Sequence, residues 1–431
     1  MSNFIPNLSY ADEMLEEIGL TSLEDLFADV PENLRGELRI DGPKSEMEVM
    51  RELRELAGKN RRANMSFIGG GIAEHYIPAA VSYLISRSEF LTAYTPYQPE
   101  ASQGSLQAMF EYQSYISELY DMDVVNASLY DMATALGEAC LMCYRISGGN
   151  KFIIPTAISE AKKAVLRNYV RGFGIMVEEV GYDERGMLNL EDLKCAVDKD
   201  TIGVYVETPN MLGVLEEEIK QVRDLAPLLV VGANPLALPL IKPPGEYGAD
   251  MAIGGFSSSL SFGGPMLGVF AAKKEYMRQM PGRIIGLTKD DGGRRSFCMI
   301  LQTREQHIRR ARATSNICTN EGLLAIASAI YFALMGGEGM KRVAAKNLEN
   351  VMSLSKRVGE MFKVPFEGST FFGEFPFMHD GMMGLRDRVF ERGIEFGPVL
   401  TGDTALIATT EMHTTREHDA LIEALMEEKN V

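Results

Sequence analysis

Short apolar runs alternate with amphipathic stretches across the middle of the chain, from about residue 65 to residue 330. Six of these runs are predicted as strands: residues 151–154, 176–180, 201–207, 228–231, 251–253 and 269–271. Between them, residues 158–171, 190–197 and 218–225 carry apolar side chains at helical spacing. This alternation predicts an α/β fold, with a mostly parallel sheet covered by helices on both faces. We expect any site to lie at the carboxyl ends of those strands.

Different patterns flank this middle region. Residues 1–64 predict an arm of short amphipathic helices, which cannot bury their apolar faces alone and therefore wrap the main body or a partner. A helix over 321–334 leads to Gly336 and Gly337 and then to a small α+β unit. In that unit Thr414 and Glu417 form a capping box before the final helix. The predicted domains are the arm 1–64, a large α/β domain 65–330 and a small α+β domain 331–431.

Composition narrows the classes of function. The chain of 431 residues carries 60 acidic and 43 basic residues, a formal net charge of −17 that disfavours nucleic acid as a partner. It shows no run of about 18 apolar residues, so we expect no membrane span. Five cysteines in so long a chain favour a reducing, cytoplasmic setting. No grouping of His, Cys, Asp and Glu has metal-ligand spacing, so we predict no metal.

The densest polar and aromatic segment is the loop LTAYTPYQPEASQG at residues 91–104. Its two prolines fix the backbone, and an amphipathic helix follows directly. The loop thus brings polar side chains close to a helix N-terminus, where free N–H groups favour an anion. The candidate site residues are Tyr94, Tyr97, Gln98, Glu100 and Gln103. The residues alone leave two interpretations open, a rigid binding loop or a proline-rich turn whose tyrosines pack under a domain interface.

Other segments have plainer interpretations. Residues 67–75 hold three consecutive glycines and His75. The spacing of these glycines does not match the dinucleotide-binding pattern G-x-G-x-x-G, and no clear strand precedes them. The segment is therefore interpreted as a tight turn with a surface histidine. Residues 128–139 begin a helix with small residues that suit phosphate, but the residues alone favour a helix cap with small-residue packing. Cys140 and Cys143 are expected to be buried helix cysteines. The serines of 254–265 have no Asp or His nearby to activate them. Six arginines cluster at 294, 295, 304, 309, 310 and 312, where we expect an interface or a solvated face.

Three segments together resemble one family. They are TAYTPYQPEASQG (92–104), NASLYDMATALGEA (126–139) and the run from residue 248 to residue 286 that ends in MPGRIIG. They are similar to the P-protein, the glycine decarboxylase of the glycine cleavage system, and the resemblance runs from about residue 4 to residue 430. Some organisms in that family split the chain, and this sequence looks like the separate N-terminal half, subunit 1 (alpha). The resemblance implies a fold-type-I pyridoxal-phosphate enzyme that decarboxylates glycine and passes the aminomethyl group to the lipoyl group of H-protein.

That family fold implies two groups this chain does not carry. A lysine binds the cofactor covalently, and an aspartate keeps its ring nitrogen protonated. Aligned on the resemblance, Val231 occupies the aspartate position and Ser258 stands near the lysine position; no lysine occurs between Lys242 and Lys273. We therefore expect no cofactor-binding residue on this chain.

The resulting hypothesis is a chain that is inactive alone. It would pair with a lysine-bearing subunit 2 (beta), as an alpha2beta2 heterotetramer, and complete that partner's site with the 94–103 loop. One alternative is a self-sufficient pyridoxal-phosphate enzyme that uses another lysine. The other is a purely structural partner that adds no side chain to the site.

Overall fold

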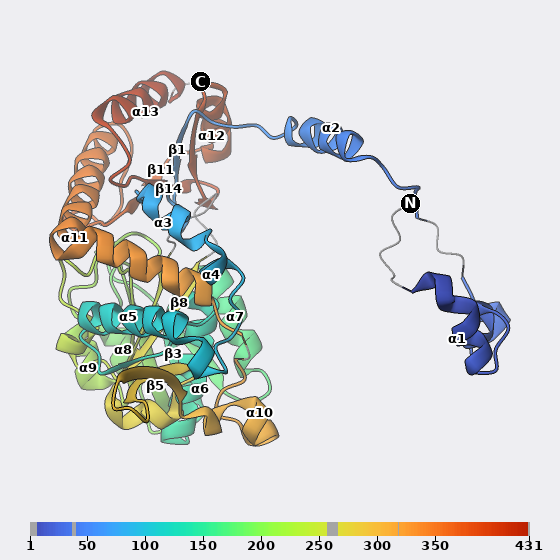
Figure 1. Cartoon of the computed structure of the whole chain (residues 1–431). Helices are drawn as coiled ribbons and strands as arrows, with labels where there is room; N and C mark the ends of the chain where they lie inside the picture. The colour runs from blue at the N-terminus through green and yellow to red at the C-terminus, as the bar shows by residue number, and fades with distance from the viewer. Residues whose placement is uncertain (1–6, 37–39, 257–265, 318, 430–431) are drawn as a thin grey trace. The chain divides into compact units, whose positions relative to one another are not determined.

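The computed structural model describes residues 7–36, 40–256, 266–317 and 319–429, which form two compact units, Met1–Arg62 and Ala63–Val431 (Figure 1). The boundary between these units lies close to the end of the predicted arm. The further division predicted between residues 330 and 331 stays a prediction.

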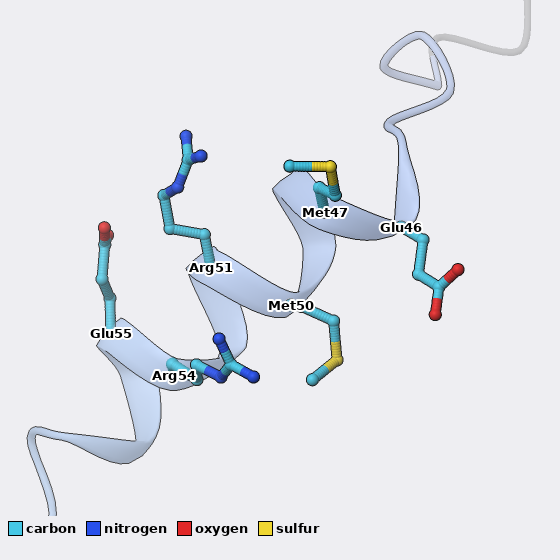
Figure 2. Close-up of a pocket in the computed structure, with 6 residues that line it drawn as sticks. All are labelled: Glu46, Met47, Met50, Arg51, Arg54 and Glu55. Carbon is cyan, nitrogen blue, oxygen red and sulfur yellow. The ribbon is translucent and has the colours of Figure 1, made fainter.

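The first unit consists of short helices with almost no core of its own. It holds η1 (Leu8–Tyr10), α1 (Ala11–Glu17), η2 (Leu23–Phe27), η3 (Glu32–Leu34) and α2 (Glu46–Ala57). Ser45 and Glu48 cap α2 reciprocally, and its side chains, Met47 and Met50 among them, project outward (Figure 2). Of the apolar side chains described in this unit, only Leu15 is buried.

The second unit is built around a seven-stranded sheet. Its strands run in the order β2 (Val124–Val125), β8 (Leu267–Ala272), β7 (Met251–Phe256), β6 (Leu229–Ala233), β5 (Thr201–Thr208), β3 (Lys151–Pro155) and β4 (Met176–Val180). From β7 to β4 all neighbours are parallel, whereas β8 is antiparallel to both β7 and β2. The mostly parallel sheet predicted from the sequence is confirmed, and all six predicted strands are present.

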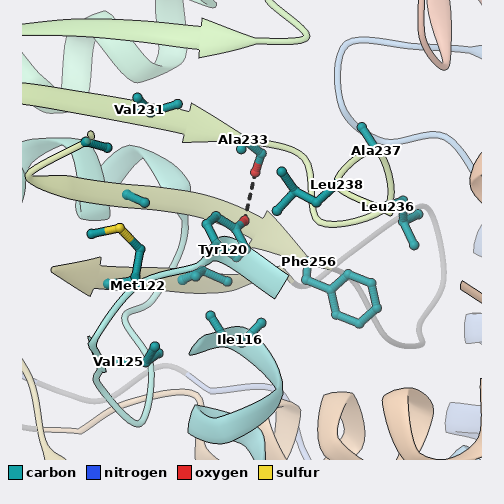
Figure 3. Close-up of a cluster of buried hydrophobic side chains, with 14 of the residues drawn as sticks. Ile116, Tyr120, Met122, Val125, Val231, Ala233, Leu236, Ala237, Leu238 and Phe256 are labelled. Atoms are coloured by element: carbon teal, nitrogen blue, oxygen red, sulfur yellow. Dashed lines mark hydrogen bonds between the residues drawn. The ribbon is translucent and has the colours of Figure 1, made fainter. Parts of the chain in front are cut away.

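Helices cover both faces of this sheet. One apolar cluster joins the sheet to α5 (Gln103–Tyr120), α8 (Leu190–Ala196), α9 (Ile219–Leu225) and α11 (Gly322–Gly359). The other joins it to α6 (Met132–Ser147) and α7 (Glu160–Val170). Alternate residues supply the two faces because strand side chains alternate, so that Val231 belongs to the first cluster and Val230 to the second. Within the first cluster the Tyr120 hydroxyl donates to the Ala233 carbonyl at 2.8 Å (Figure 3).

Helix α11 connects the sheet to the C-terminal part of the chain and packs beside α5 (Figure 1). α11 is long and apolar enough to cross a membrane by length and composition alone. However, half of its most apolar stretch is buried inside the fold, as expected for a core helix. At Gly336 the backbone leaves the helical conformation, where the sequence predicted a break. The helix nevertheless continues beyond this kink to Gly359.

The C-terminal elements form a second, smaller core. A three-stranded sheet has the order β11 (Glu374–Met378), β14 (Thr404–Ala408), β13 (Val399–Thr401), and α12 (Met382–Glu391) and α13 (Thr415–Glu428) pack against it. The predicted Thr414–Glu417 capping box is confirmed. The absence of a strand before the three glycines was predicted wrongly, because β1 (Met65–Ile68) pairs in parallel with β12 (Ile394–Gly397). Local residue patterns do not reveal a pairing between strands that lie 329 positions apart, Met65 with Ile394.

Candidate functional site

The proline-rich loop lies on the surface between α4 (Ser88–Leu91) and α5. Its backbone is fixed by a buried Pro96 and by the short helix η4 (Pro99–Ala101). The Tyr94 side chain is 74% exposed and Tyr97 is 45% exposed. Gln98 and Glu100 are also exposed. The loop therefore presents four of the five predicted site residues to solvent or to a partner, which is where a second chain would meet them.

Gln103, the fifth predicted residue, is engaged in the fold. Its amide donates to the Phe297 carbonyl at 2.8 Å and to the Pro99 carbonyl at 2.7 Å, and its oxygen accepts the Phe297 N–H at 2.9 Å. Phe297 lies on β10 (Arg295–Ile300), which pairs with β9 (Ile284–Lys289) as an antiparallel ribbon. The side chain thus satisfies the outward backbone groups of an edge strand.

Gln113 repeats this arrangement on the other edge of the ribbon. Its amide exchanges two hydrogen bonds of 2.9 Å with the backbone of Ile285 on β9. Gln103 and Gln113 are ten residues apart on the helix, a rise of about 15 Å. This matches roughly three strand spacings of 4.8 Å, one between the two strands and one from each strand to the glutamine on its outer edge. Helix α5 therefore holds both outer edges of the ribbon, and the loop before it is tied to the same ribbon. Gln113 lies within the apolar stripe of α5, and a polar residue in a buried stripe is the signal that could have found it.

Tyr97 is held by two side chains that sequence reasoning missed. The Arg283 guanidinium donates to the Tyr97 hydroxyl at 3.2 Å, and its carbon lies 5.4 Å from the centre of the tyrosine ring. His307 meets the same ring edge-on, with ring centres 5.8 Å apart. Arg283 is 3% exposed, whereas His307 is on the surface. The only sequence signal for Arg283 was its place in the MPGRIIG part of the family resemblance.

Beside the loop runs a groove of about 630 Å³ between η4 and the β9–β10 ribbon. Glu100 and Gln103 line one side, and Arg294, Arg295 and Cys298 line the other. Arg294 is paired with Asp290 at 2.8 Å, whereas Arg295 stands over the Phe297 ring. The groove thus carries both signs of charge next to the exposed tyrosines.

The remaining arginines of the cluster divide into two kinds. Arg304 is buried, and its guanidinium donates to the carbonyls of Met280 and Gly282, so this residue is structural rather than part of a solvated face. Burial lowers the pKa of Arg304 to about 10. Arg309, Arg310 and Arg312 are exposed and form no ion pair with any residue of the described ranges.

The carboxyl ends of the sheet strands face a small cavity of about 90 Å³, below the roughly 300 Å³ at which ligand pockets typically begin. Asn234 and Phe256 line it from the sheet, and His75, Glu374 and Thr410 from the other side. The lining residues in the described part of the chain include no lysine. The predicted lysine position, Ser258, lies outside the described residues.

On β6, Val231 and Gly232 face opposite sides of the sheet, and side chains pack closely on both. Val231, at the predicted aspartate position, is fully buried in the apolar cluster. A Cβ on Gly232 would come within 2.2 Å of the Tyr205 hydroxyl and 2.9 Å of Met132 Cε. The Tyr205 hydroxyl donates to Glu207 at 2.6 Å, and Glu207 pairs with Lys162 at 2.5 Å.

A carboxylate occupies the start of α6, where the sequence suggested phosphate. Asp131 is the N-cap; its Oδ1 accepts from the Thr134 N–H and from the Thr134 hydroxyl, both at 2.7 Å. A second anion there would meet this negative charge and find that N–H already used. The helix-cap interpretation is confirmed, and the described residues of this pocket do not fit pyridoxal phosphate.

The three-glycine turn also has a structural partner. The Gly70 N–H donates to Glu374 on β11, and a Cβ on Gly69 would lie 2.2 Å from the same carboxylate. Burial raises the pKa of Glu374 to about 7, against the effect of the Gly70 donor. His75, predicted as a surface histidine, is half-buried, and its Nδ1 lies 3.0 Å from a Glu411 oxygen. The turn therefore ties β1 to the C-terminal sheet.

The two cysteines of α6 are buried, as predicted. Cys140 and Cys143 are both 0% exposed, and burial raises the pKa of each thiol. Among the residues the structure describes, no group of three or more His, Cys, Asp and Glu side chains is placed to hold a metal ion.

The chain is similar to known proteins over nearly its whole length. The family described as the glycine cleavage system P-protein matches residues 3–425. Relatives named probable glycine dehydrogenase (decarboxylating) subunit 1 are 48% identical in Thermococcus onnurineus and 47% identical in Thermococcus kodakarensis. Both alignments cover 99% of this chain, and 99% and 98% of the relatives.

Solved structures give a matching result. A crystal structure of glycine decarboxylase (P-protein) of the glycine cleavage system, in inhibitor-bound form, has a TM-score of 0.89 at 40% identity and covers 99% of this chain and 100% of its own. Lactobacillus brevis glutamate decarboxylase has a TM-score of 0.67 at 11% identity and covers 95% of this chain and 98% of its own. The second likeness concerns the fold alone, and the fold-type-I architecture predicted from the sequence is confirmed.

Proposed function

The chain belongs to the family of glycine cleavage system P-proteins, and we propose that it is subunit 1 of a two-subunit glycine dehydrogenase (decarboxylating). The complex releases carbon dioxide from glycine and passes the aminomethyl group to the lipoyl group of H-protein. The relatives' name, subunit 1, implies a further subunit in their enzymes. We assign pyridoxal phosphate to that partner subunit, because a valine stands at the aspartate position and the Asp131 carboxylate already caps the helix start that would hold the phosphate.

The observation that carries this proposal is a contrast within one chain. The pocket at the carboxyl ends of the strands is filled by the chain's own side chains, whereas the most distinctive segment, the 94–103 loop, turns its tyrosines outward. The Tyr97 ring is held by Arg283 and His307 and is still 45% exposed, so it is available to a site that another molecule completes. Tyr94, Tyr97, Gln98 and Glu100 are accordingly the residues proposed to reach the partner's site, while Gln103 holds the loop in place.

The assembly follows the same logic. We propose an alpha2beta2 heterotetramer in the cytoplasm, in keeping with the free thiols of Cys140, Cys143, Cys195 and Cys298. H-protein docks through local basic residues despite the net charge of −17. The exposed Arg309, Arg310 and Arg312 are the candidates, since they follow closely in sequence on His307, whose ring packs against Tyr97 of the loop.

The experiment separates this proposal from a self-sufficient enzyme. This chain is purified alone and with its partner subunit, incubated with pyridoxal phosphate and reduced with borohydride, and the labelled lysines are identified by mass spectrometry. We expect no stoichiometric label on this chain, one on the partner, and glycine decarboxylation only by the complex. A single lysine of this chain labelled stoichiometrically would overturn the assignment.

A second experiment separates shared catalysis from a purely structural role. Tyr94→Ala and Gln98→Ala are introduced into the assembled complex, and assembly and turnover are measured together. Because both side chains are exposed, assembly should be retained while turnover falls. Unchanged kinetics in both variants would favour the structural alternative.

A further inference from the structure

We propose that Arg283 is a positioning residue that makes Tyr97 a hydrogen-bond donor to the carboxylate of the bound amino acid. The inference rests on the proposed function, because it assumes that the tyrosine loop reaches the partner's site. It extends that function by assigning the substrate group that Tyr97 recognises and the residue that orients the phenol.

The direction of the hydrogen bond follows from the chemistry of the two groups. A guanidinium carries donors only, so at 3.2 Å the Tyr97 oxygen is the acceptor. The phenol's own proton must then point away from Arg283. Since the Tyr97 side chain is 45% exposed, that proton is available to an acceptor outside this chain.

The ring is fixed as well as the oxygen. Arg283 lies 5.4 Å from the ring centre, within the range in which a cation is attracted to an aromatic face. His307 packs edge-on against the same ring and lies 3.6 Å from Glu305. The phenol of Tyr97 therefore has little freedom to turn, and its donor direction is set before any ligand arrives.

The backbone that carries Arg283 is anchored on both sides. Arg304 donates to the carbonyls of Met280 and Gly282, and the Gly282 N–H donates to the Ser315 hydroxyl at 2.8 Å. The Arg283 carbonyl accepts the Ala127 N–H at 2.7 Å. Keeping a guanidinium that is 3% exposed is costly unless its contacts are well made. The contact with Tyr97 links this buried framework to the exposed loop.

An outward phenolic donor fits an anionic oxygen best, because hydrogen bonds to charged acceptors are about twice as strong as neutral ones. In an amino acid that group is the carboxylate. Methylamine, which is glycine without its carboxylate, lacks the acceptor. Preference for glycine over methylamine is therefore the property that Arg283 and Tyr97 control together.

The test uses the assembled complex with its cofactor. Glycine and methylamine dissociation constants are measured from the change in cofactor absorbance, and glycine kcat and KM are measured separately. The variants are Tyr97→Phe, Arg283→Gln, Arg283→Lys and the double change Tyr97→Phe with Arg283→Gln. The control is Arg278→Gln, an exposed arginine with no contact to the loop.

We expect Tyr97→Phe to weaken glycine binding about 10- to 100-fold, the range for a hydrogen bond to a charged group, and to leave methylamine binding nearly unchanged. Arg283→Gln should have a similar effect, and adding it to Tyr97→Phe should cost nothing further. Arg283→Lys should keep part of the discrimination because it keeps a donor. Arg278→Gln should match the unsubstituted complex.

Two results would overturn the inference. One is a loss in Arg283→Gln that adds fully to that of Tyr97→Phe. The other is equal weakening of glycine and methylamine binding in both Arg283 variants, which indicates a merely structural role. An unsubstituted complex that does not act on glycine would instead refute the proposed function. If Arg283→Gln fails to assemble, the same comparison is decided by Arg283→Lys.

Discussion

Replacing Gln103 by alanine should destabilise the chain rather than remove a reacting group. The change leaves the backbone N–H and carbonyl of Phe297 without their side-chain partner. Phe297 lies on an edge strand and is only 6% exposed, so water replaces that partner poorly. Three hydrogen bonds are lost, two to Phe297 and one to the Pro99 carbonyl, each contributing about 0.5–1.5 kcal/mol net, and poorly hydrated backbone groups remain. We therefore expect a loss of about 2 kcal/mol in the free energy of unfolding.

The assay is urea denaturation of the full chain, followed by glycine turnover in the complex. Gln98→Ala is the matched control, since it lies in the same loop but is exposed, and its stability should change by less than about 0.5 kcal/mol. Gln103→Met, which keeps length but not the amide, should lose as much stability as Gln103→Ala. Full stability of Gln103→Ala together with abolished turnover would refute the anchoring role and restore Gln103 as a site residue.

Three further predictions concern other parts of the fold. Burial raises the pKa of Glu374 from 4.5 to about 7 in the folded chain. Its contribution to the free energy of unfolding is therefore fully present below pH 4.5 and is lost as the pH rises through 7. Glu374→Gln does not titrate, so it should flatten the fall in unfolding free energy between about pH 5 and 8, measured by urea titration. Gly213→Ala should prevent folding or cost more than about 3 kcal/mol, because Gly213 has a φ of +74° and an added Cβ would lie 1.8 Å from the Glu374 carbonyl oxygen. Gly181→Ala, whose Cβ would lie 3.8 Å from Asp192, is the control and should fold normally by circular dichroism. Neutralising Arg309 and Arg312 together should raise KM for H-protein several-fold at low salt and less at high salt; equal KM values at all salt concentrations would place the docking surface elsewhere.

The central sheet was predictable because its strands are buried on both faces. Residues 151–155 and 201–208 are apolar runs without alternation, and such runs separated by helical segments define a parallel sheet. The pairing of β1 with β12 was not predictable, because only the folded chain brings Met65 next to Ile394. The β9–β10 ribbon was missed although its signal is local, because Asp290 to Gly293 form a glycine-containing turn between its two strands.

The candidate site was predictable as a segment but not residue by residue. Prolines and tyrosines in one short stretch identified the loop. The sequence could not distinguish the anchoring role of Gln103 from the exposed position of Gln98, because both are glutamines in the same short segment. Only the folded chain places the backbone of Phe297 within 3 Å of the Gln103 amide. Arg283 was invisible as a neighbour of Tyr97, since 185 residues separate the two.

The aspartate that caps α6 bears on how this polypeptide could ever regain independence. Introducing a lysine and an acidic partner by mutation would leave the Asp131 carboxylate at the start of α6, where it would still repel the phosphate of a cofactor. The proposed dependence on a lysine-bearing subunit would therefore be maintained by a helix-capping residue as well as by the missing lysine and aspartate.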